Sequence, residues 1–162
     1  MILDIGSGTG DEWHKLSTGK DILHADIKRK APHLELTCDV CNLPFPDNSI
    51  PIVHAGHLFE HLEDPMRALK EIKRVVQKFA IITVPNASFF KVRPSGLKEH
   101  IFSWNEWTLK TFLERVFENV EITKTVKWEI FGNWRFPKLQ KLKRLFERWL
   151  FGRDELTAIC RK

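Results

Sequence analysis

Ile2-Leu3-Asp4-Ile5-Gly6-Ser7-Gly8-Thr9-Gly10 is the stretch that decides the fold, because an apolar strand runs into glycine at every second position. Glycine at alternate positions lets the backbone turn sharply and lets a ligand touch it without meeting a Cβ atom. After a buried strand and before a helix, such a loop predicts a cofactor site at the carboxyl end of a parallel sheet. The loop alone is weak evidence, so the rest of the chain decides which cofactor it binds.

The composition is that of one soluble domain. The 162 residues suffice for a single core without disulfides, and the hydrophobic fraction of 43% is ordinary for a globular protein. No apolar run reaches the roughly 20 residues that span a bilayer. The amino terminus has neither the basic region nor the cleavage site of a signal peptide. We therefore expect residues 1–162 to form one cytoplasmic domain.

The positive charge is concentrated in one segment. Residues 133–153 carry a net charge of +6, which leaves −1 on the rest of the chain from a total of +5. The same segment has apolar residues at helical spacing, so it predicts a basic amphipathic helix inserted before the last strand. Such a helix could pack on the sheet, cover an acidic or lipid-like substrate, contact a membrane surface or RNA, or form a homodimer. Nucleic acid is the less favoured partner, since the rest of the chain is not basic.

Strands alternate with helices along the chain. We expect helices at 11–17, from Pro65 after the cap Asp64, and after a capping box at Ser103-Trp104-Asn105-Glu106. The expected strands are residues 1–5, 21–26, 34–38, 50–55, 79–84, 120–126 and 156–160. This alternation predicts an α/β fold, with a three-layer, doubly wound and mostly parallel sheet.

Acidic residues lie at the ends of the first three expected strands, namely Asp4, Asp26 and Asp39. In such a sheet, ligands bind beyond the carboxyl ends of the strands, at the point where the strand order reverses. Asp26 is placed to accept both hydroxyls of a ribose, and Asp39 to accept from an exocyclic amine such as that of adenine. Each carboxylate alone could be merely solvated. Their register with the glycine loop favours a nucleoside site.

The glycine spacing excludes the common phosphate-binding loops. A dinucleotide-binding loop needs a third glycine where this chain has Asp11, which disfavours a nicotinamide dehydrogenase, and no Gly-Lys-Ser/Thr of a nucleotide triphosphate loop is present. No lysine or arginine lies near the glycines to hold a phosphate. A cofactor without phosphates, with a cationic centre and an amino-acid tail, fits this acidic site better.

Asp4-Ile5-Gly6-Ser7-Gly8-Thr9-Gly10 resembles the first motif of class I S-adenosylmethionine-dependent methyltransferases. Leu43-Pro44-Phe45-Pro46-Asp47-Asn48-Ser49, Phe59-Glu60-His61-Leu62-Glu63-Asp64-Pro65 and Val84-Pro85-Asn86 resemble later landmarks of the small-molecule branch. The resemblance covers about residues 1–123 and implies a Rossmann-like fold. It also implies S-adenosylmethionine as cofactor, with S-adenosylhomocysteine as product. The implied cofactor-binding residues are Asp4, Gly6, Ser7, Gly8, Gly10, Asp26, Ile27, Asp39 and Val40.

The chain departs from the family pattern at two places. The family usually has a helix before the first strand that helps to cover the cofactor, and we expect none here, so the pocket would be more open or covered by a partner subunit. The fourth strand usually begins Phe-Asp, whereas here it begins Ile50-Pro51. Proline lacks a backbone donor, so we expect Pro51 at the first residue of that strand.

The candidate catalytic residues are His57 and His61, with Glu60 between them, and His100 after the fifth strand. If the chain is helical at 57–61, these side chains share one face, where a histidine could act as general base. The pattern also loosely resembles the metal-dependent 2′-O-methyltransferases of small-RNA 3′ ends. Those have glutamate where His57 stands, so a metal is not predicted. The histidines at 14, 24, 33 and 54 are interpreted as structural or solvated.

The sequence therefore predicts transfer of a methyl group from S-adenosylmethionine to an unidentified acceptor, with a small molecule favoured. The alternatives are an RNA-directed or metal-dependent 2′-O-methyltransferase, and a module that binds S-adenosylmethionine without catalysis.

Overall fold

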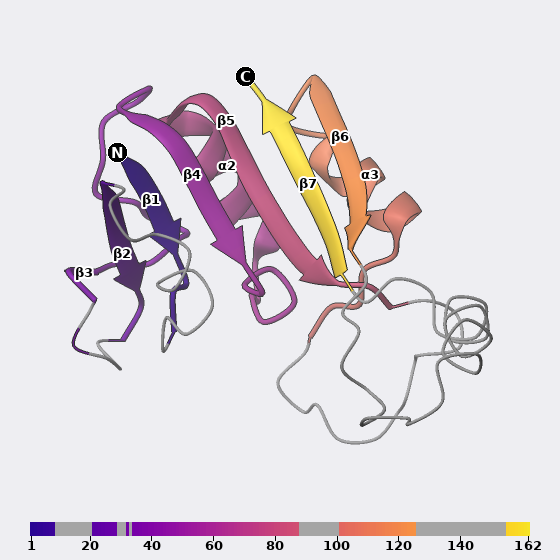
Figure 1. The fold of residues 1–162 in the computed structure, drawn as a ribbon, viewed down its shortest axis with the longest axis horizontal. Helices are drawn as coiled ribbons and strands as arrows, with labels where there is room; N and C mark the ends of the chain where they lie inside the picture. Colours follow the sequence, from indigo (N-terminus) through magenta and orange to yellow (C-terminus); the bar gives the residue numbers. More distant parts are fainter. Residues whose placement is uncertain (9–20, 29–31, 33, 88–100, 126–154) are drawn as a thin grey trace, which may run out of the picture.

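Seven strands form one sheet in the order β3-β2-β1-β4-β5-β7-β6 (Figure 1). The computed structural model describes residues 1–8, 21–28, 32, 34–87, 101–125 and 155–162. The strands are β1 (Ile2–Ile5), β2 (Ile22–Asp26), β3 (Leu36–Thr37), β4 (Ile50–Gly56), β5 (Val76–Pro85), β6 (Asn119–Thr125) and β7 (Glu155–Arg161). The first five are parallel, and β7 runs antiparallel to both β5 and β6. The predicted Rossmann-like, mostly parallel sheet is confirmed.

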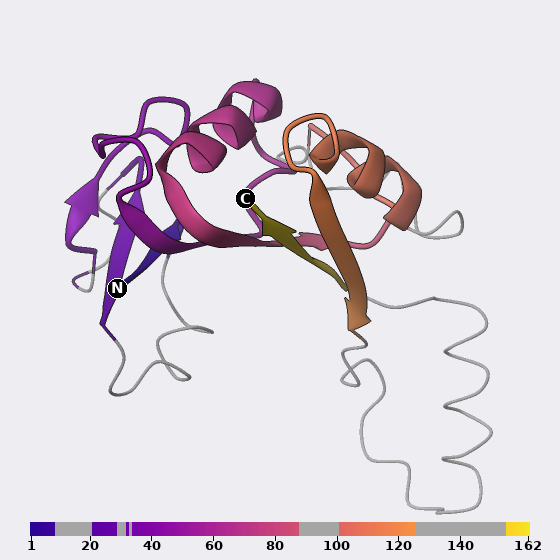
Figure 2. The same ribbon diagram turned by 90° about the horizontal axis from the view of Figure 1, so that it is seen from above.

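Two helices, α2 (Pro65–Val75) and α3 (Glu106–Leu113), cover the same face of the sheet (Figure 2). The start of α2 is as predicted, since the Asp64 carboxylate accepts from the Arg67 N–H and proline occupies the first helical position. The expected helices at 11–17 and 133–153 lie outside the described residues. Within the described residues, no helix has the length and apolar character needed to cross a bilayer.

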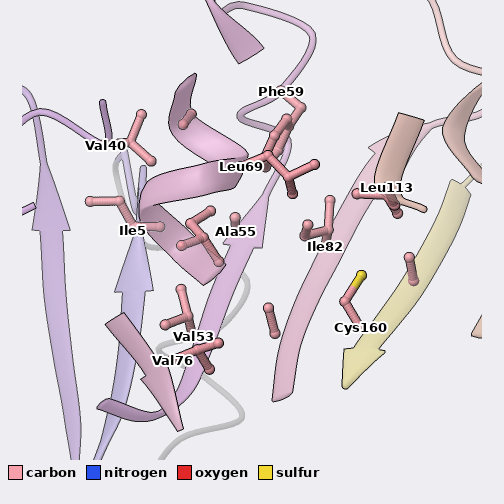
Figure 3. Packing of buried hydrophobic residues seen from close by; sticks show 14 of the residues in the cluster. Ile5, Val40, Val53, Ala55, Phe59, Leu69, Val76, Ile82, Leu113 and Cys160 are labelled. Carbon is pink, nitrogen blue, oxygen red and sulfur yellow. The ribbon is translucent and has the colours of Figure 1, made fainter. Parts of the chain in front are cut away.

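The hydrophobic core lies between these two helices and the sheet. Figure 3 shows Ile5 of β1, Val53 of β4 and Ile82 of β5 among the side chains packed there with Leu69 of α2 and Leu113 of α3. All five are at most 2% exposed. Burying one such side chain contributes about 1.5–3 kcal/mol, so this layer fixes the sheet against the helices.

Three predicted strand boundaries are wrong. The helix before β5 ends at Val75, and Val76 is already extended (φ −72°, ψ 140°). The expected strand starts at Phe79, but Val76 already pairs with Ile50 of β4. Pro51 is the second residue of β4, and a register shift between Ile50 and Ile52 accommodates its missing donor. Only two residues of the predicted strand 34–38 pair as β3.

The amino terminus of α3 also differs from the prediction. Asn105, not Ser103, is the N-cap, and its side chain accepts from the Thr108 N–H at 2.9 Å. The Thr108 hydroxyl in turn accepts from the Asn105 N–H at 3.0 Å. This reciprocal pair completes a capping box two residues later than we expected, because Asn-x-x-Thr provides the same donors and acceptors as the predicted motif.

The loop before β4 is held by two charged side chains of α2. The Glu71 carboxylate accepts from the Leu43 N–H at 3.0 Å, and Arg74 donates to the carbonyls of Leu43 and Phe45 at 3.0 and 2.7 Å. Arg74 also donates to both Glu71 oxygens at 2.8 Å, which lowers the pKa of Glu71. The turn-forming residues of this loop are therefore fixed to the helix that covers the core.

Asp4 lies on the opposite face of the sheet from these helices, between two histidines of the neighbouring strands. It pairs in register with His24 of β2 and His54 of β4. Its Oδ2 atom lies 3.0 Å from His24 Nδ1 and its Oδ1 atom 2.6 Å from His54 Nδ1. All three residues are buried. This cluster joins β2, β1 and β4 two residues before Gly6, and of the two roles expected of these histidines, structural or solvated, the structure shows the structural one.

The ionic state of Asp4 follows from this environment. Burial alone raises the pKa of Asp4, but the hydrogen bonds and charge of His54, with hydrogen bonds from His24 and Ser7, outweigh it. The pKa of Asp4 is therefore held below its ordinary value of 3.8. A carboxylate paired in this way remains charged in the fold at neutral pH.

The N-cap assignment can be tested by removing each candidate cap. Asn105→Ala should lower the free energy of unfolding by about 1 kcal/mol, because the Thr108 N–H loses its acceptor. Ser103→Ala, two residues earlier on an exposed side chain, should leave it unchanged. Urea unfolding of both variants measures the difference. A larger loss in Ser103→Ala would restore the predicted cap.

Asp4→Asn should lower the free energy of unfolding at pH 7 by about 3–5 kcal/mol, because it breaks a buried ion pair. Since the folded pKa of Asp4 is lowered, its stabilisation is complete above the unfolded value of 3.8. That stabilisation is lost as the pH falls through the lower folded value, so the difference from wild type should shrink below about pH 4. Asp21→Asn, whose side chain is 83% exposed, is the matched control. Equal losses in the two variants would contradict a special role for Asp4.

Candidate functional site

The glycine loop follows β1 at the point where the strand order reverses, between β1 and β4. Gly6 has φ +75°, a conformation that glycine adopts without strain, and its N–H donates to the Ala25 carbonyl at 2.8 Å. A Cβ atom on Gly6 would lie 2.9 Å from Leu58 Cδ1. Glycine is therefore required here by the backbone turn and by the close approach of the segment after β4.

Asp26, the last residue of β2, connects the glycine loop to the second strand. Its Oδ2 atom accepts from the Gly8 N–H at 2.9 Å and its Oδ1 atom from the Lys28 N–H at 3.2 Å. Each carboxylate oxygen has a second lone pair, so Asp26 retains the capacity to accept from a ribose. Gly8 also has positive φ (+53°), and a Cβ atom there would meet no atom of the described residues within 4 Å. The loop therefore presents an open backbone surface beside Asp26.

Three further residues predicted to bind the cofactor follow the ends of β2 and β3. Ile27 follows Asp26 directly and is 63% exposed. Asp39 is exposed, and its carboxylate accepts from the Cys41 N–H at 2.8 Å, which orders the turn after β3. Val40 is 6% exposed and packs with the core (Figure 3). An apolar surface and an acceptor thus lie at the ends of β2 and β3.

Two of the predicted cofactor contacts lie beneath the loop. The Asp4 carboxylate is occupied by the two histidines, and the Ser7 hydroxyl donates to the Asp4 carbonyl at 3.1 Å. The Ser7 N–H donates to the Ala25 carbonyl at 3.1 Å. Both residues shape the loop from below in this structure, and their contact with the cofactor stays a prediction. Gly10 lies outside the described residues.

His57 follows β4 and has a strained backbone. Its φ is +51°, and its N–H donates to the Thr83 carbonyl of β5 at 2.8 Å. Left-handed backbone on a residue other than glycine costs about 1–3 kcal/mol and is frequent at functional sites. The ring lies between two carboxylates, with Nδ1 at 3.5 Å from Glu60 Oε1 and Nε2 at 3.3 Å from Glu155 Oε1.

The chain is not helical at 57–61, so the condition for His57, Glu60 and His61 to share one helix face is not met. The segment after β4 is a turn, in which the His61 N–H donates to the Leu58 carbonyl at 3.0 Å. Glu60 is consequently buried, while His61 is exposed. His100 lies outside the described residues. In the parts of the chain that the structure describes, no three histidine, cysteine or acidic side chains gather in a way that could hold a metal ion.

Sequence reasoning missed Glu155, the first residue of β7, as a neighbour of His57. No local pattern points to it, because the antiparallel pairing of β7 with β5 brings it there.

The cluster around Asp4, in contrast, is marked by a pattern in the sequence. Each of the three strands has a residue that marks its carboxyl end, namely Gly6, Asp26 and Gly56. The members of the cluster lie two positions before these residues, at Asp4, His24 and His54. Aligning those ends would have placed the three side chains in one row.

Comparisons with known proteins identify the family and the fold. A family model described as a methyltransferase domain matches residues 3–84, about half of the chain. Demethylmenaquinone methyltransferase of Thermotoga maritima is 30% identical over 100 residues, which cover 48% of this chain and 39% of that protein. The chain spans 14% and 39% of the lengths of the two curated relatives that it matches.

Two solved structures show the same fold. A SAM-dependent methyltransferase of Archaeoglobus fulgidus is 22% identical with a TM-score of 0.71, and the match covers 99% of this chain and 85% of that one. Phosphoethanolamine N-methyltransferase 2 of Haemonchus contortus, in complex with S-adenosyl-L-methionine, is 14% identical with a TM-score of 0.67. That match covers 99% of this chain and 47% of the other. The expected fold and the family's cofactor, S-adenosylmethionine, are confirmed. The chain belongs to the class I S-adenosylmethionine-dependent methyltransferases.

Proposed function

We propose that this protein binds S-adenosylmethionine over the glycine loop and transfers its methyl group to a small-molecule acceptor. The observation that carries the proposal is the pairing of Gly8 with Asp26. Among the described residues nothing lies above the Gly8 backbone, and its N–H donates to the Asp26 carboxylate, which has further lone pairs that can accept from a ligand. A nucleoside with an amino-acid tail uses both features at once.

Each described residue of the loop has a distinct task in this proposal. Gly6 and Gly8 bring the backbone to the amino-acid end of the cofactor, and Asp26 accepts from the ribose hydroxyls. Ile27 and Asp39 contact the adenine, with its apolar face against Ile27 and its exocyclic amine toward Asp39. The cofactor supplies a methyl group on a cationic sulfur, so the protein needs chiefly to align donor and acceptor. Alignment of this kind is worth roughly 7–11 kcal/mol of the barrier.

The acceptor is proposed to be a small molecule that enters beside β4 and β5. The relatives named above are a methyltransferase of demethylmenaquinone and one of phosphoethanolamine, both small but chemically different. The comparisons therefore support the size of the acceptor more than its chemistry. His57 lies at this end of the sheet with its side chain 40% exposed, which makes it the candidate group for contact with the acceptor.

The extent of the domain and the place of the basic helix are proposed from the sequence alone. Residues 1–162 are proposed to form one domain, and the basic helix expected at 133–153 to lie on the acceptor side. That segment and His100 lie outside the described residues.

Gly8→Ala tests the cofactor site. A methyl group there fits the open space but occupies the surface on which the cofactor would lie, so S-adenosylhomocysteine should bind roughly tenfold or more weakly, about 1.4 kcal/mol. The left-handed backbone also costs about 1–2 kcal/mol of stability. Isothermal titration calorimetry measures the affinity.

Asn48→Ala is the matched control, because Asn48 also has positive φ (+54°) but lies in the loop before β4. This variant should lose some stability and bind S-adenosylhomocysteine as wild type does. Absence of binding to wild type at about 1 mM ligand, or −4.1 kcal/mol, would refute the proposed function.

A further inference from the structure

The ring of His57 is held from both sides by carboxylates that come from different parts of the chain. Glu60 lies in the turn three residues later, and Glu155 opens β7 on the other side of β5. The Nδ1 atom is 3.5 Å from Glu60 Oε1, and Nε2 is 3.3 Å from Glu155 Oε1. The negative charge of an ionised carboxylate favours a proton on a ring nitrogen close to it, so each of these contacts favours a proton on the nitrogen that it faces.

The two carboxylates differ in their access to water. The Glu60 side chain is 2% exposed and that of Glu155 is 14% exposed. Within the described residues, neither oxygen of the Glu60 carboxylate accepts a hydrogen bond. Burying a carboxylate without hydrogen bonds costs folding free energy, and most buried polar groups are paired. The burial of Glu60 therefore calls for a functional explanation. Among the described residues, the His57 ring is a polar neighbour of this carboxylate, with Nδ1 at 3.5 Å from Oε1.

The backbone of Glu60 is well fixed, which makes the carboxylate a rigid partner. The Glu60 carbonyl accepts from the N–H groups of Ile101 and Phe102 at 2.7 and 3.1 Å. The backbone of His57 is fixed as well, because its N–H donates a hydrogen bond to the Thr83 carbonyl. The imidazole and the buried carboxylate are therefore set relative to each other by hydrogen bonds of the main chain.

His57 is also next to the proposed cofactor loop. Leu58, the following residue, lies so close to Gly6 that a Cβ atom on that glycine would be 2.9 Å from Leu58 Cδ1. The His57 imidazole therefore lies at the carboxyl end of β4, next to Leu58, whose side chain packs on the glycine loop. The less buried of its two partners, Glu155, faces Nε2.

We propose that Glu60 is a positioning residue that keeps the proton of His57 on Nδ1, and that Nε2 is the catalytic atom that receives the proton of the methyl acceptor. Glu155 occupies Nε2 until the acceptor replaces it. This inference rests on the proposed function and deepens it, since it assigns the acceptor side of the same site. It also requires the acceptor to carry its proton on the atom that is methylated.

The proton and electrons balance in the following way. As Glu155 moves aside, the proton that it shares with Nε2 leaves on the Glu155 carboxyl group or passes to water. The acceptor atom then forms its bond to the methyl carbon while the carbon–sulfur bond breaks, and sulfur keeps that electron pair. The acceptor proton moves to Nε2, and the charge of Glu60 stabilises the resulting imidazolium, as a carboxylate does in other histidine dyads.

Long-range ¹H–¹⁵N NMR of the histidine rings tests this assignment without an acceptor. His57→Asn identifies the His57 signals, and asparagine tolerates the left-handed backbone there. In the neutral form of the wild-type protein, His57 should carry its proton on Nδ1, because the negative charge of the buried Glu60 carboxylate lies 3.5 Å from that nitrogen. Glu155→Gln should keep that tautomer, whereas Glu60→Gln should lose it. Glu63→Gln, an exposed residue three positions later, is the control and should change nothing.

A wild-type His57 with its proton on Nε2 would overturn the proposal, and this result needs no variant to fold. A Glu60→Gln protein that keeps the Nδ1 proton would overturn it as well. Calorimetry with S-adenosylhomocysteine on the same samples separates the two proposals, because all three glutamine variants should bind it as wild type does. Failure of wild type to bind would instead remove the proposed function and leave the tautomer result standing.

Discussion

An aspartate held between two histidines fixes the place where three parallel strands end. Asp4, His24 and His54 occupy matching positions on β1, β2 and β4, so their contacts run across the sheet and set its register. A slip of one residue would move these side chains to the apolar face under α2, where their charges would be desolvated without partners. The register in turn decides where the backbone leaves β1, and the glycine loop begins there.

The site depends on this register at each step. Once β1 and β2 are aligned, Asp26 comes beside the Gly8 N–H and holds the loop open. Once β1 and β4 are aligned, Leu58 packs on Gly6 and His57 faces the same end of the sheet. The core on the other face secures the strands, and the ion pairs of Arg74 and Glu71 secure the loop before β4. The core therefore secures one face of the sheet, the Asp4 cluster joins strands on the other, and the candidate site lies at the carboxyl ends of the strands.

The sequence was sufficient for features that depend on local pattern. The glycine loop and Asp26 stand next to buried strands, and the start of α2 has both a cap and a proline, so each was predictable. The cap of α3 was not, because two overlapping motifs, one from Ser103 and one from Asn105, fit equally well. The early start of β5 at Val76 depends on pairing with β4. The neighbourhood of His57 and Glu155 depends on contacts between residues far apart in the chain, which a single sequence does not reveal.

The central claim is that one surface, made by the glycine loop and the ends of β2 and β3, binds S-adenosylmethionine. A crystal structure of the protein with S-adenosylhomocysteine tests it most directly. The account predicts the ribose hydroxyls on the Asp26 carboxylate, the adenine against Ile27 and the amino-acid tail over Gly6 and Gly8. A ligand bound elsewhere on the sheet, with Asp26 contacting only the Gly8 and Lys28 N–H groups, would contradict it.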